Sequence, residues 1–196
     1  MVSRIIRLAL VTIVAGAFSV ARAEIDLTPT YSVRQLEGCK FQQLEFRDQA
    51  MRITYELPKG WNCNAPDKFT LTLLPPAKDM VSAKIKYIAI PGPLVLDEVQ
   101  LNHFKQTANQ LLPPESVING EPTIAPDPLL LNGHHTCEID ILFGLHSHRL
   151  RMSVLFVDLG DSQLRFSLIA RPTDFDELHK AFLNSWYSWQ WLDIKK

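Results

Sequence analysis

The chain has 196 residues, of which 46% are apolar and 21% charged, and its 20 Lys and Arg nearly balance its 21 Asp and Glu. This composition is typical of a globular protein and excludes a disordered chain, a collagen and a disulfide-dense mini-protein. A pI near 6.6 argues against nucleic acid as the main partner.

The first 23 residues have the pattern of a secretory signal peptide. Arg4 and Arg7 precede an apolar run at residues 8–20, and Ala21-Arg22-Ala23 places small residues where signal peptidase cuts. The run is about 13 residues long, too short for an uncleaved membrane anchor, and the residue directly after the cleavage point is Glu24, not the Cys that a lipid anchor would need. We therefore predict cleavage after Ala23, an exported protein that is periplasmic or extracellular, and no later transmembrane segment.

Removing residues 1–23 takes away three arginines and no acids, so residues 24–196 carry a charge of about −4 and are long enough for one domain. The three cysteines, Cys39, Cys63 and Cys137, all lie in this part. Export exposes them to oxidation. A Cys39–Cys63 bridge across a hairpin and three reduced thiols both stay open, and Cys137 is expected to be buried and inert.

Residues 24–37 have no period and are interpreted as an N-terminal arm. Residues 51–57 alternate apolar and polar side chains, which predicts a half-buried strand. Residues 41–46 are expected to pair with it across residues 47–50, and the turn at residues 58–61 ends it.

Two further alternating runs, at residues 69–73 and 83–87, predict strands. A helix then begins with Asp97 as its N-cap and ends at Pro113-Pro114. Its apolar stripe contains Leu101, Phe104, Ala108 and Leu111. The proline-rich stretch at residues 122–128 predicts a loop or an irregular edge strand.

Residues 136–171 predict a three-strand meander. We expect its alternate apolar side chains to be buried beneath the final helix, and we expect Phe143 to pair with His148, which places Asp140 opposite Arg151. Gly160-Asp161-Ser162 is the next tight turn. The apolar sets are Cys137, Ile139, Ile141 and Phe143; Leu150, Met152, Val154 and Phe156; and Leu164, Phe166, Leu168 and Ala170.

The final helix is expected to begin at Thr173 or Asp174 and to bury a stripe of side chains on the sheet. That stripe is Phe175, Leu178, Phe182, Ser185, Trp186 and Trp189. The pattern as a whole predicts an α+β domain, an antiparallel sheet flanked by helices.

Three passages resemble the PsbP-like superfamily, which includes photosystem II PsbP, Ran-binding Mog-type import factors and bacterial DcrB-like envelope proteins. They are residues 53–61, Asn132-Gly133 before a meander with a basic central strand, and Asp174-Phe175-Asp176 opening the last helix. The resemblance covers most of residues 40–192 and implies an α/β/α sandwich that binds or stabilises partner proteins. It brings no catalytic residues, and the chain lacks the lipid-bearing Cys typical of DcrB-like lipoproteins.

Four histidines between residues 134 and 148 suggest zinc or copper. A hairpin turned near residues 144–147 separates His135 from His146 by more than about 20 Å. His146 and His148 remain as a weak bidentate pair without a third ligand. We expect solvated histidines at a hairpin tip, and no metal or other cofactor.

Gly160-Asp161-Ser162 with Asp176 and His179 resembles the blocks of GDS-type esterases. Ser162 and His179 are only 17 residues apart, and Ser162 lies in a turn that supplies no oxyanion amides. A secreted hydrolase is therefore the most distant alternative.

Two weak binding surfaces complete the candidates. One is a polar sheet face with Arg149, Arg151, Arg165 and Arg171, which would hold an anion. The other is Tyr187 with Trp191, outside the stripe of the final helix, where they either pack on the N-terminal arm or contact a partner.

These patterns favour an exported, non-enzymatic protein that binds or stabilises another protein of the bacterial cell envelope. The alternative is a small-ligand carrier or sensor with a pocket between sheet and helix, lined by the four arginines.

Overall fold

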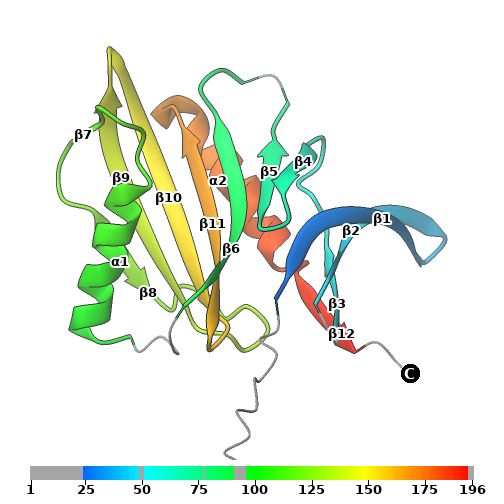
Figure 1. Cartoon of the computed structure of the whole chain (residues 1–196). Coiled ribbons are helices and arrows are strands. Elements are labelled where there is room, and N and C mark those ends of the chain that lie inside the picture. The colour runs from blue at the N-terminus through cyan, green and yellow to red at the C-terminus, as the bar shows by residue number, and fades with distance from the viewer. Residues whose placement is uncertain (1–23, 49–50, 77, 91–95, 194–196) are drawn as a thin grey trace, which may run out of the picture.

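The computed structural model describes residues 24–48, 51–76, 78–90 and 96–193, and arranges them in two antiparallel sheets and two helices (Figure 1). The predicted signal peptide lies outside the described residues, as do the side chains of residues 36 and 39–41. The strands are β1 (Asp26–Leu36), β2 (Cys39–Arg47), β3 (Met51–Tyr55), β4 (Asn62–Asp67), β5 (Thr70–Leu74), β6 (Ser82–Ala89), β7 (Val117–Ile118), β8 (Thr123–Pro126), β9 (Thr136–Leu145), β10 (His148–Asp158), β11 (Ser162–Ala170) and β12 (Gln190–Asp193); the helices are α1 (Glu98–Gln110) and α2 (Pro172–Trp186).

The larger sheet has eight strands in the order β4-β5-β6-β11-β10-β9-β7, with β8 also paired to β9. It contains the predicted meander and the predicted strands at 69–73 and 83–87. The expected pairing of Phe143 with His148 is wrong by two residues, because Leu150 pairs with Phe143. The turn falls at His146, whose φ is +52°, and Gly144 stays inside β9. A shift of two residues keeps every side chain on its face of the sheet.

The smaller sheet has the order β1-β2-β3-β12. The predicted hairpin of β2 and β3 is confirmed, with Phe46 paired to Ile53. The N-terminal arm is not irregular, because residues 26–36 form β1 along β2. Only its start is buried, at Ile25 and Leu27, and the rest reaches into solvent, with Tyr31 and Val33 exposed. A strand with two exposed faces has no apolar period to detect.

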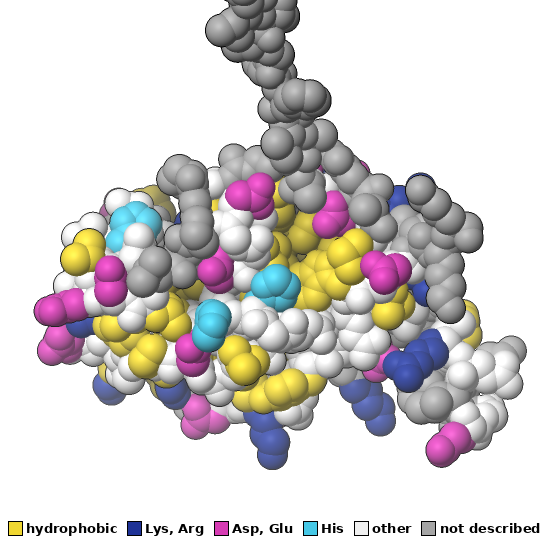
Figure 2. Space-filling view, turned by 90° about the horizontal axis from the view of Figure 1, so that it is seen from below, with side chains coloured by type: hydrophobic (Ala, Val, Ile, Leu, Met, Phe, Trp, Pro, Cys, Tyr) yellow, Lys and Arg dark blue, Asp and Glu magenta, His cyan; other side chains and the backbone are white. Residues whose placement is uncertain are grey.

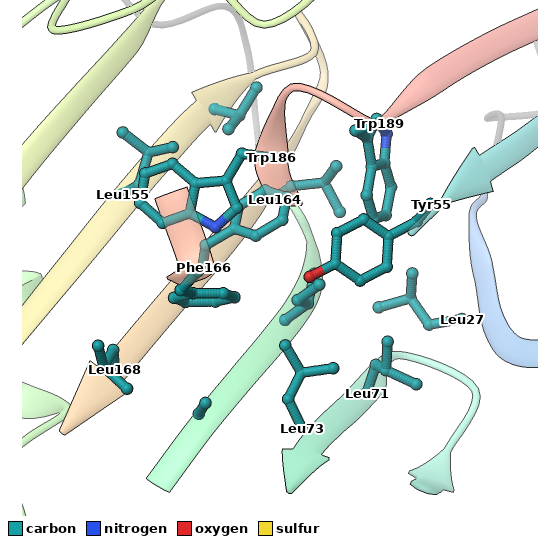
Figure 3. Packing of buried hydrophobic residues seen from close by; sticks show 14 of the residues in the cluster. Leu27, Tyr55, Leu71, Leu73, Leu155, Leu164, Phe166, Leu168, Trp186 and Trp189 are labelled. Atoms are coloured by element: carbon teal, nitrogen blue, oxygen red, sulfur yellow. The ribbon is translucent and has the colours of Figure 1, made fainter. Parts of the chain in front are cut away.

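The apolar sides of the three meander strands do not all face the same helix. In β9 and β10 they pack with Phe104 and Ala108 of α1. In β11 they face the opposite side of the sheet, because Phe166 pairs with Leu155, not with Phe156. There they form a second core with α2, with Trp189 in the segment between α2 and β12, and with residues of the smaller sheet such as Tyr55 (Figure 3). The prediction that all three strands lie beneath the final helix is therefore wrong, although each buries its predicted apolar set.

The two helices begin for different reasons. Asp97 caps α1 as predicted, and its carboxylate accepts the Gln100 backbone N–H at 2.8 Å. In α2 the expected caps are wrong: the N-cap is Arg171, and Pro172 occupies the first turn, where its missing N–H costs nothing. The helix ends at Trp186, earlier than the aromatic pattern indicated, and the chain continues into β12.

The fold is therefore sheet-dominated α+β. One helix packs on each face of the larger sheet, but a second sheet closes the core beside α2. This arrangement agrees with an antiparallel sheet carrying helices and is more complex than a three-layer sandwich. Neither helix of the described chain combines the length and hydropathy that a membrane span requires.

Candidate functional site

A cleft of about 390 Å³ opens where the two sheets meet at one end of the strands. Both sheets contribute to it, and so does the loop before β9. Its apolar lining is Ile25, Met51, Leu159 and Trp191, and its polar lining is Asp48, Asn132, His134, Asp161 and Ser162. Figure 2 views this end of the molecule and shows hydrophobic side chains beside a histidine, bordered by acidic side chains. We refer to this site as the Trp191 cleft.

Trp191 is held in the cleft by strand pairing and by two neighbouring rings. It pairs with Ile53 of β3, which fixes its position on the edge strand β12. Its ring lies 5.0 Å from the ring of His134 and 5.9 Å from that of Trp189. Trp189 is fully buried, whereas Trp191 is half-buried. The cleft therefore presents one indole on a rigid support.

The His134 side of the cleft is built by a tight turn at Asn132-Gly133. Both residues have positive φ, +51° and +84°, as a two-residue hairpin turn of this type requires. Leu131 and His134 exchange backbone hydrogen bonds across it. The Asn132 side-chain amide donates to the Trp189 carbonyl. The turn is thereby fastened to the junction of α2 and β12, and it carries His134 against Trp191.

The charge of the cleft comes from two carboxylates. Asp48 lies in the bend between β2 and β3, and Asp161 lies in the turn between β10 and β11. No lysine or arginine is among the described residues of its lining.

A second polar cluster lies between α2 and the larger sheet. The Ser153 hydroxyl and His179 Nε2 both bond Oε1 of Glu138, at 2.5 and 2.7 Å. Burial alone would raise the pKa of Glu138, but these hydrogen bonds and the nearby charges of His179 and Arg151 outweigh it and lower that pKa. The carboxylate of Glu138 on β9 thus holds His179, and with it α2, on the larger sheet.

Arg151 extends this cluster to the surface. It binds Asp140 with paired contacts of 2.9 Å and Asp176 with one of 2.9 Å, and its guanidinium lies 4.3 Å from the Phe175 ring centroid. The expected link between Asp140 and Arg151 is therefore present, although the two residues are diagonal neighbours and not directly opposite.

The predicted four-arginine surface does not form. Arg151 shares its face with Ala170, whereas Arg165 shares the opposite face with Phe156. The reason is the register, which pairs odd positions of β10 with even positions of β11. Arg149 lies two residues before Arg151 on β10 and so shares its face, and Arg171 is the N-cap of α2. None of the four lines the Trp191 cleft or either of two further cavities of the described chain, one beside the end of α2 and one beside residues 57–62.

The histidines of the hairpin tip are spread apart. His146 is exposed, with Nδ1 3.8 Å from Glu115, and His148 begins β10. His135 lies at the other end of β9, where its Nδ1 is 2.9 Å from Asp127. Among the described residues no three His, Cys, Asp or Glu side chains are grouped closely enough to hold a metal ion.

Cys63 is a free thiol, so the structure does not contain the Cys39–Cys63 bridge. After β3 the chain turns into the larger sheet, where the Cys63 sulfur lies 3.6 Å from the Tyr31 hydroxyl. Cys39 begins β2 at the tip of the β1–β2 hairpin, opposite Leu36, and its side chain is outside the described residues. Cys137 is free and buried, and burial raises its pKa to about 12.

The esterase-like residues are not brought together. His179 is hydrogen-bonded to Glu138 of β9. Glu138 pairs with Leu155 of β10, and Leu155 in turn pairs with Phe166 of β11. Ser162 lies four residues from Phe166 along β11, about 13 Å away. Ser162 instead lines the Trp191 cleft.

The two aromatic candidates have different environments. Tyr187 is the C-cap of α2 and is 61% exposed, outside the cleft. Trp191 lines it. Sequence reasoning therefore named one cleft residue, Trp191, as a contact candidate. It missed Asp48, Asp161 and the role of His134, because only the topology brings these turns to one place. The sequence contains one indication of this site, because Asn132-Gly133 predicts a tight turn directly before His134.

The sequence matches no protein-family model and no curated protein. Several solved structures are similar in fold. A protein of unknown function from Pseudomonas aeruginosa has a TM-score of 0.45 and 15% identity, over 80% of this chain and 94% of its own. Cyanobacterial PsbP from Synechocystis has a TM-score of 0.48 and 12% identity, over 70% and 85%. A Bacteroides thetaiotaomicron protein has a TM-score of 0.43 and 7% identity, over 74% and 46%.

Proposed function

We propose that the protein is an exported, non-enzymatic binding protein of the bacterial cell envelope and that the Trp191 cleft receives its partner protein. The observation that supports this proposal is the half-buried indole of Trp191 in a cleft assembled from both sheets. Tryptophan in a preformed pocket is the residue type most enriched among the side chains that dominate binding energies.

The export part of the proposal rests on the basic, apolar and small-residue pattern of residues 1–23. The non-enzymatic part rests on the polar groups of the described chain. Glu138, Ser153 and His179 are committed to one another beneath α2, and Ser162 lies far from His179. A binding role, unlike an enzymatic one, requires no set of catalytic side chains.

Site-directed photo-crosslinking tests the proposal. A photo-reactive residue at Met51, in the cleft, is compared in the native host with one at Val99, which is 74% exposed on α1. We expect a discrete protein adduct from position 51, none of that mass from position 99, and loss of the adduct when Trp191 is also changed to Ala. Identical adducts from both positions, or an adduct that ignores Trp191→Ala, contradict the proposal.

One observation favours the second candidate, a small-ligand carrier or sensor. The cleft volume of about 390 Å³ falls within the range of small-molecule sites, roughly 300–1,000 Å³. Its position differs from the pocket expected between sheet and helix. Native mass spectrometry of the purified protein tests this role, because a bound small molecule that is lost in Trp191→Ala would favour the carrier over a protein-binding module.

A further inference from the structure

We infer that two copies of the protein associate through the outer edge of β1, with each β1 pairing antiparallel to the β1 of the other copy about Val33. The inference goes beyond the proposed function and does not depend on the Trp191 cleft. It rests on three observations, which are the open edge of β1, the backbone groups that this edge presents and the side chains that flank them.

The outer edge of β1 is the longest strand edge at the border of either sheet. β1 has 11 residues and ends the order β1-β2-β3-β12, whereas the outermost strands β4, β12 and β7 have 6, 4 and 2 residues. Figure 1 shows the β1–β2 hairpin reaching away from the larger sheet. Among the described residues, one backbone hydrogen bond leaves β1 for an element other than β2, from Leu27 to Lys68. An edge of this kind is a template for a further strand.

The turn of the hairpin determines which backbone groups face outward. Glu37-Gly38 is a two-residue turn with φ values of +49° and +82°, and Leu36 pairs with Cys39 across it. The residues that flank such a turn exchange hydrogen bonds, and antiparallel pairs then alternate between bonded and non-bonded. The residues whose N–H and C=O groups point away from β2 are therefore Tyr31, Val33 and Gln35.

These three residues form a self-complementary set. If a second β1 lies antiparallel with its Val33 opposite Val33, its Gln35 lies opposite Tyr31, and all three outward residues fall into bonded pairs. The regular edge ends on one side at Pro29, which has no N–H, and at the register shift before Thr30, and on the other side at the turn. The outward N–H and C=O groups of this stretch are therefore all paired by a second copy.

The exposed side chains of β1 are also matched by a second copy. Tyr31 and Val33 are 58% and 64% exposed. In the pairing about Val33 the two valines are direct neighbours, and each lies diagonal to Tyr31 of the other copy. Pairs of β-branched and aromatic side chains stabilise neighbouring strands, so the association covers apolar surface that a single copy leaves in water.

The charge of the edge permits this pairing. Arg34 is the one charged residue between positions 30 and 36, and it would lie opposite Ser32 of the second copy, not opposite the second arginine. Glu56 of its own chain lies 3.9 Å from the Arg34 guanidinium. Proteins that remain monomeric commonly carry lysine or proline along an open edge, and residues 30–36 contain neither.

Disulfide trapping tests the pairing about Val33. Val33→Cys is combined with Cys39→Ser and Cys63→Ser, because Cα atoms in a bonded antiparallel pair are about 5.5 Å apart, within the reach of a disulfide. Gln35→Cys in the same background is the matched control, since the two copies of position 35 would be more than about 13 Å apart. We expect mild oxidation of the purified protein to give a covalent dimer through position 33 and none through position 35.

Val33→Pro tests the contribution of the backbone. The N–H of Val33 points away from β2, so proline removes two donors per dimer and leaves the β1–β2 hydrogen bonds in place. We expect sedimentation equilibrium to show a monomer–dimer equilibrium for the wild type and a dissociation constant raised about tenfold or more in Val33→Pro. Val33→Thr keeps the N–H and the β-branched shape and is expected to retain the dimer. Circular dichroism shows whether each variant is folded.

A wild type that stays monomeric at every concentration overturns the inference, and so does a dimer that is unchanged in folded Val33→Pro. Covalent dimers that form equally through positions 33 and 35 also overturn it. If Val33→Pro unfolds, disulfide trapping carries the test. The adduct expected from position 51 does not depend on any of these results, so the inference and the proposed function can fail separately.

Discussion

At the scale of single residues, Glu138 shows how a buried charge is kept ionised. Its side chain is only 15% exposed, yet it receives hydrogen bonds from Ser153 and His179 and lies near Arg151. These contacts lower its pKa below the ordinary value of 4.5. A carboxyl group with a lowered pKa in the folded state stabilises the fold above its ordinary pKa, and this contribution is lost as the pH falls through the lowered value.

Glu138→Gln is expected to lower the free energy of unfolding at neutral pH by about 1–3 kcal/mol, because it leaves buried donors poorly paired. The difference from the wild type should begin to shrink below pH 4.5, where Glu138 is protonated in the unfolded chain, and should shrink further until the pH falls through the lowered pKa of the folded state. Urea denaturation at several pH values measures it, with Glu177→Gln as an exposed control. A difference that is the same at pH 3 and pH 7 would show that the ionised carboxylate contributes nothing.

At the scale of elements, the positions of the turns fix the strand registers, which the alternation of apolar and polar residues does not determine. Alternation predicted β9 and β10 and their buried faces, but it is unchanged by a slip of two residues, so Gly144 was placed in the turn that His146 occupies. Gly160 was placed correctly. Its φ is +91°, a conformation open to glycine and strained for other residues.

Gly160→Ala is expected to destabilise the protein by about 1–3 kcal/mol through backbone strain alone, since a Cβ at this position would meet no atom within 4 Å. Gly144→Ala is the matched control. Its Cβ would lie 3.6 Å from the Asn119 side chain, an ordinary contact, and we expect a change within about 1 kcal/mol. Urea midpoints of the two variants measure the difference, and equal losses would contradict the turn assignment.

At the scale of the whole molecule, Trp189 joins the two sheets. Its ring lies 5.5 Å from the rings of Phe46 and Tyr55 in the smaller sheet and 5.5 Å from that of Phe166 in the larger one. The apolar period predicted that Trp189 is buried. It did not predict the second sheet, because β1 has buried residues only near its start, such as Leu27, and β12 is only four residues long.

Trp189→Ala is expected to cost about 3–5 kcal/mol, because it opens a cavity between the sheets. Tyr187→Ala, two residues away and 61% exposed, should change stability by less than about 0.5 kcal/mol. Guanidinium denaturation followed by circular dichroism measures both. Comparable stability of the two variants would mean that Trp189 does not join the sheets.

The candidate site was harder to predict than the fold for a physical reason. A strand can be predicted from apolar side chains that recur every two residues, whereas the lining of the cleft comes from segments that are far apart in the sequence, such as those of Ile25, Asp161 and Trp191. The sequence indicated that Trp191 falls outside the helical stripe. Only the pairing of β12 with β3 shows which charges surround it.

The core beside α2 also constrains when the molecule can fold. Ile25 and Leu27 are synthesised before every strand of the larger sheet, yet they share this core with Trp186 and Trp189, which are synthesised after all of those strands. A growing chain cannot close the core until those indoles have left the ribosome. Until then the apolar sides of the earlier strands stay uncovered, and chaperones that bind exposed apolar segments can recognise them.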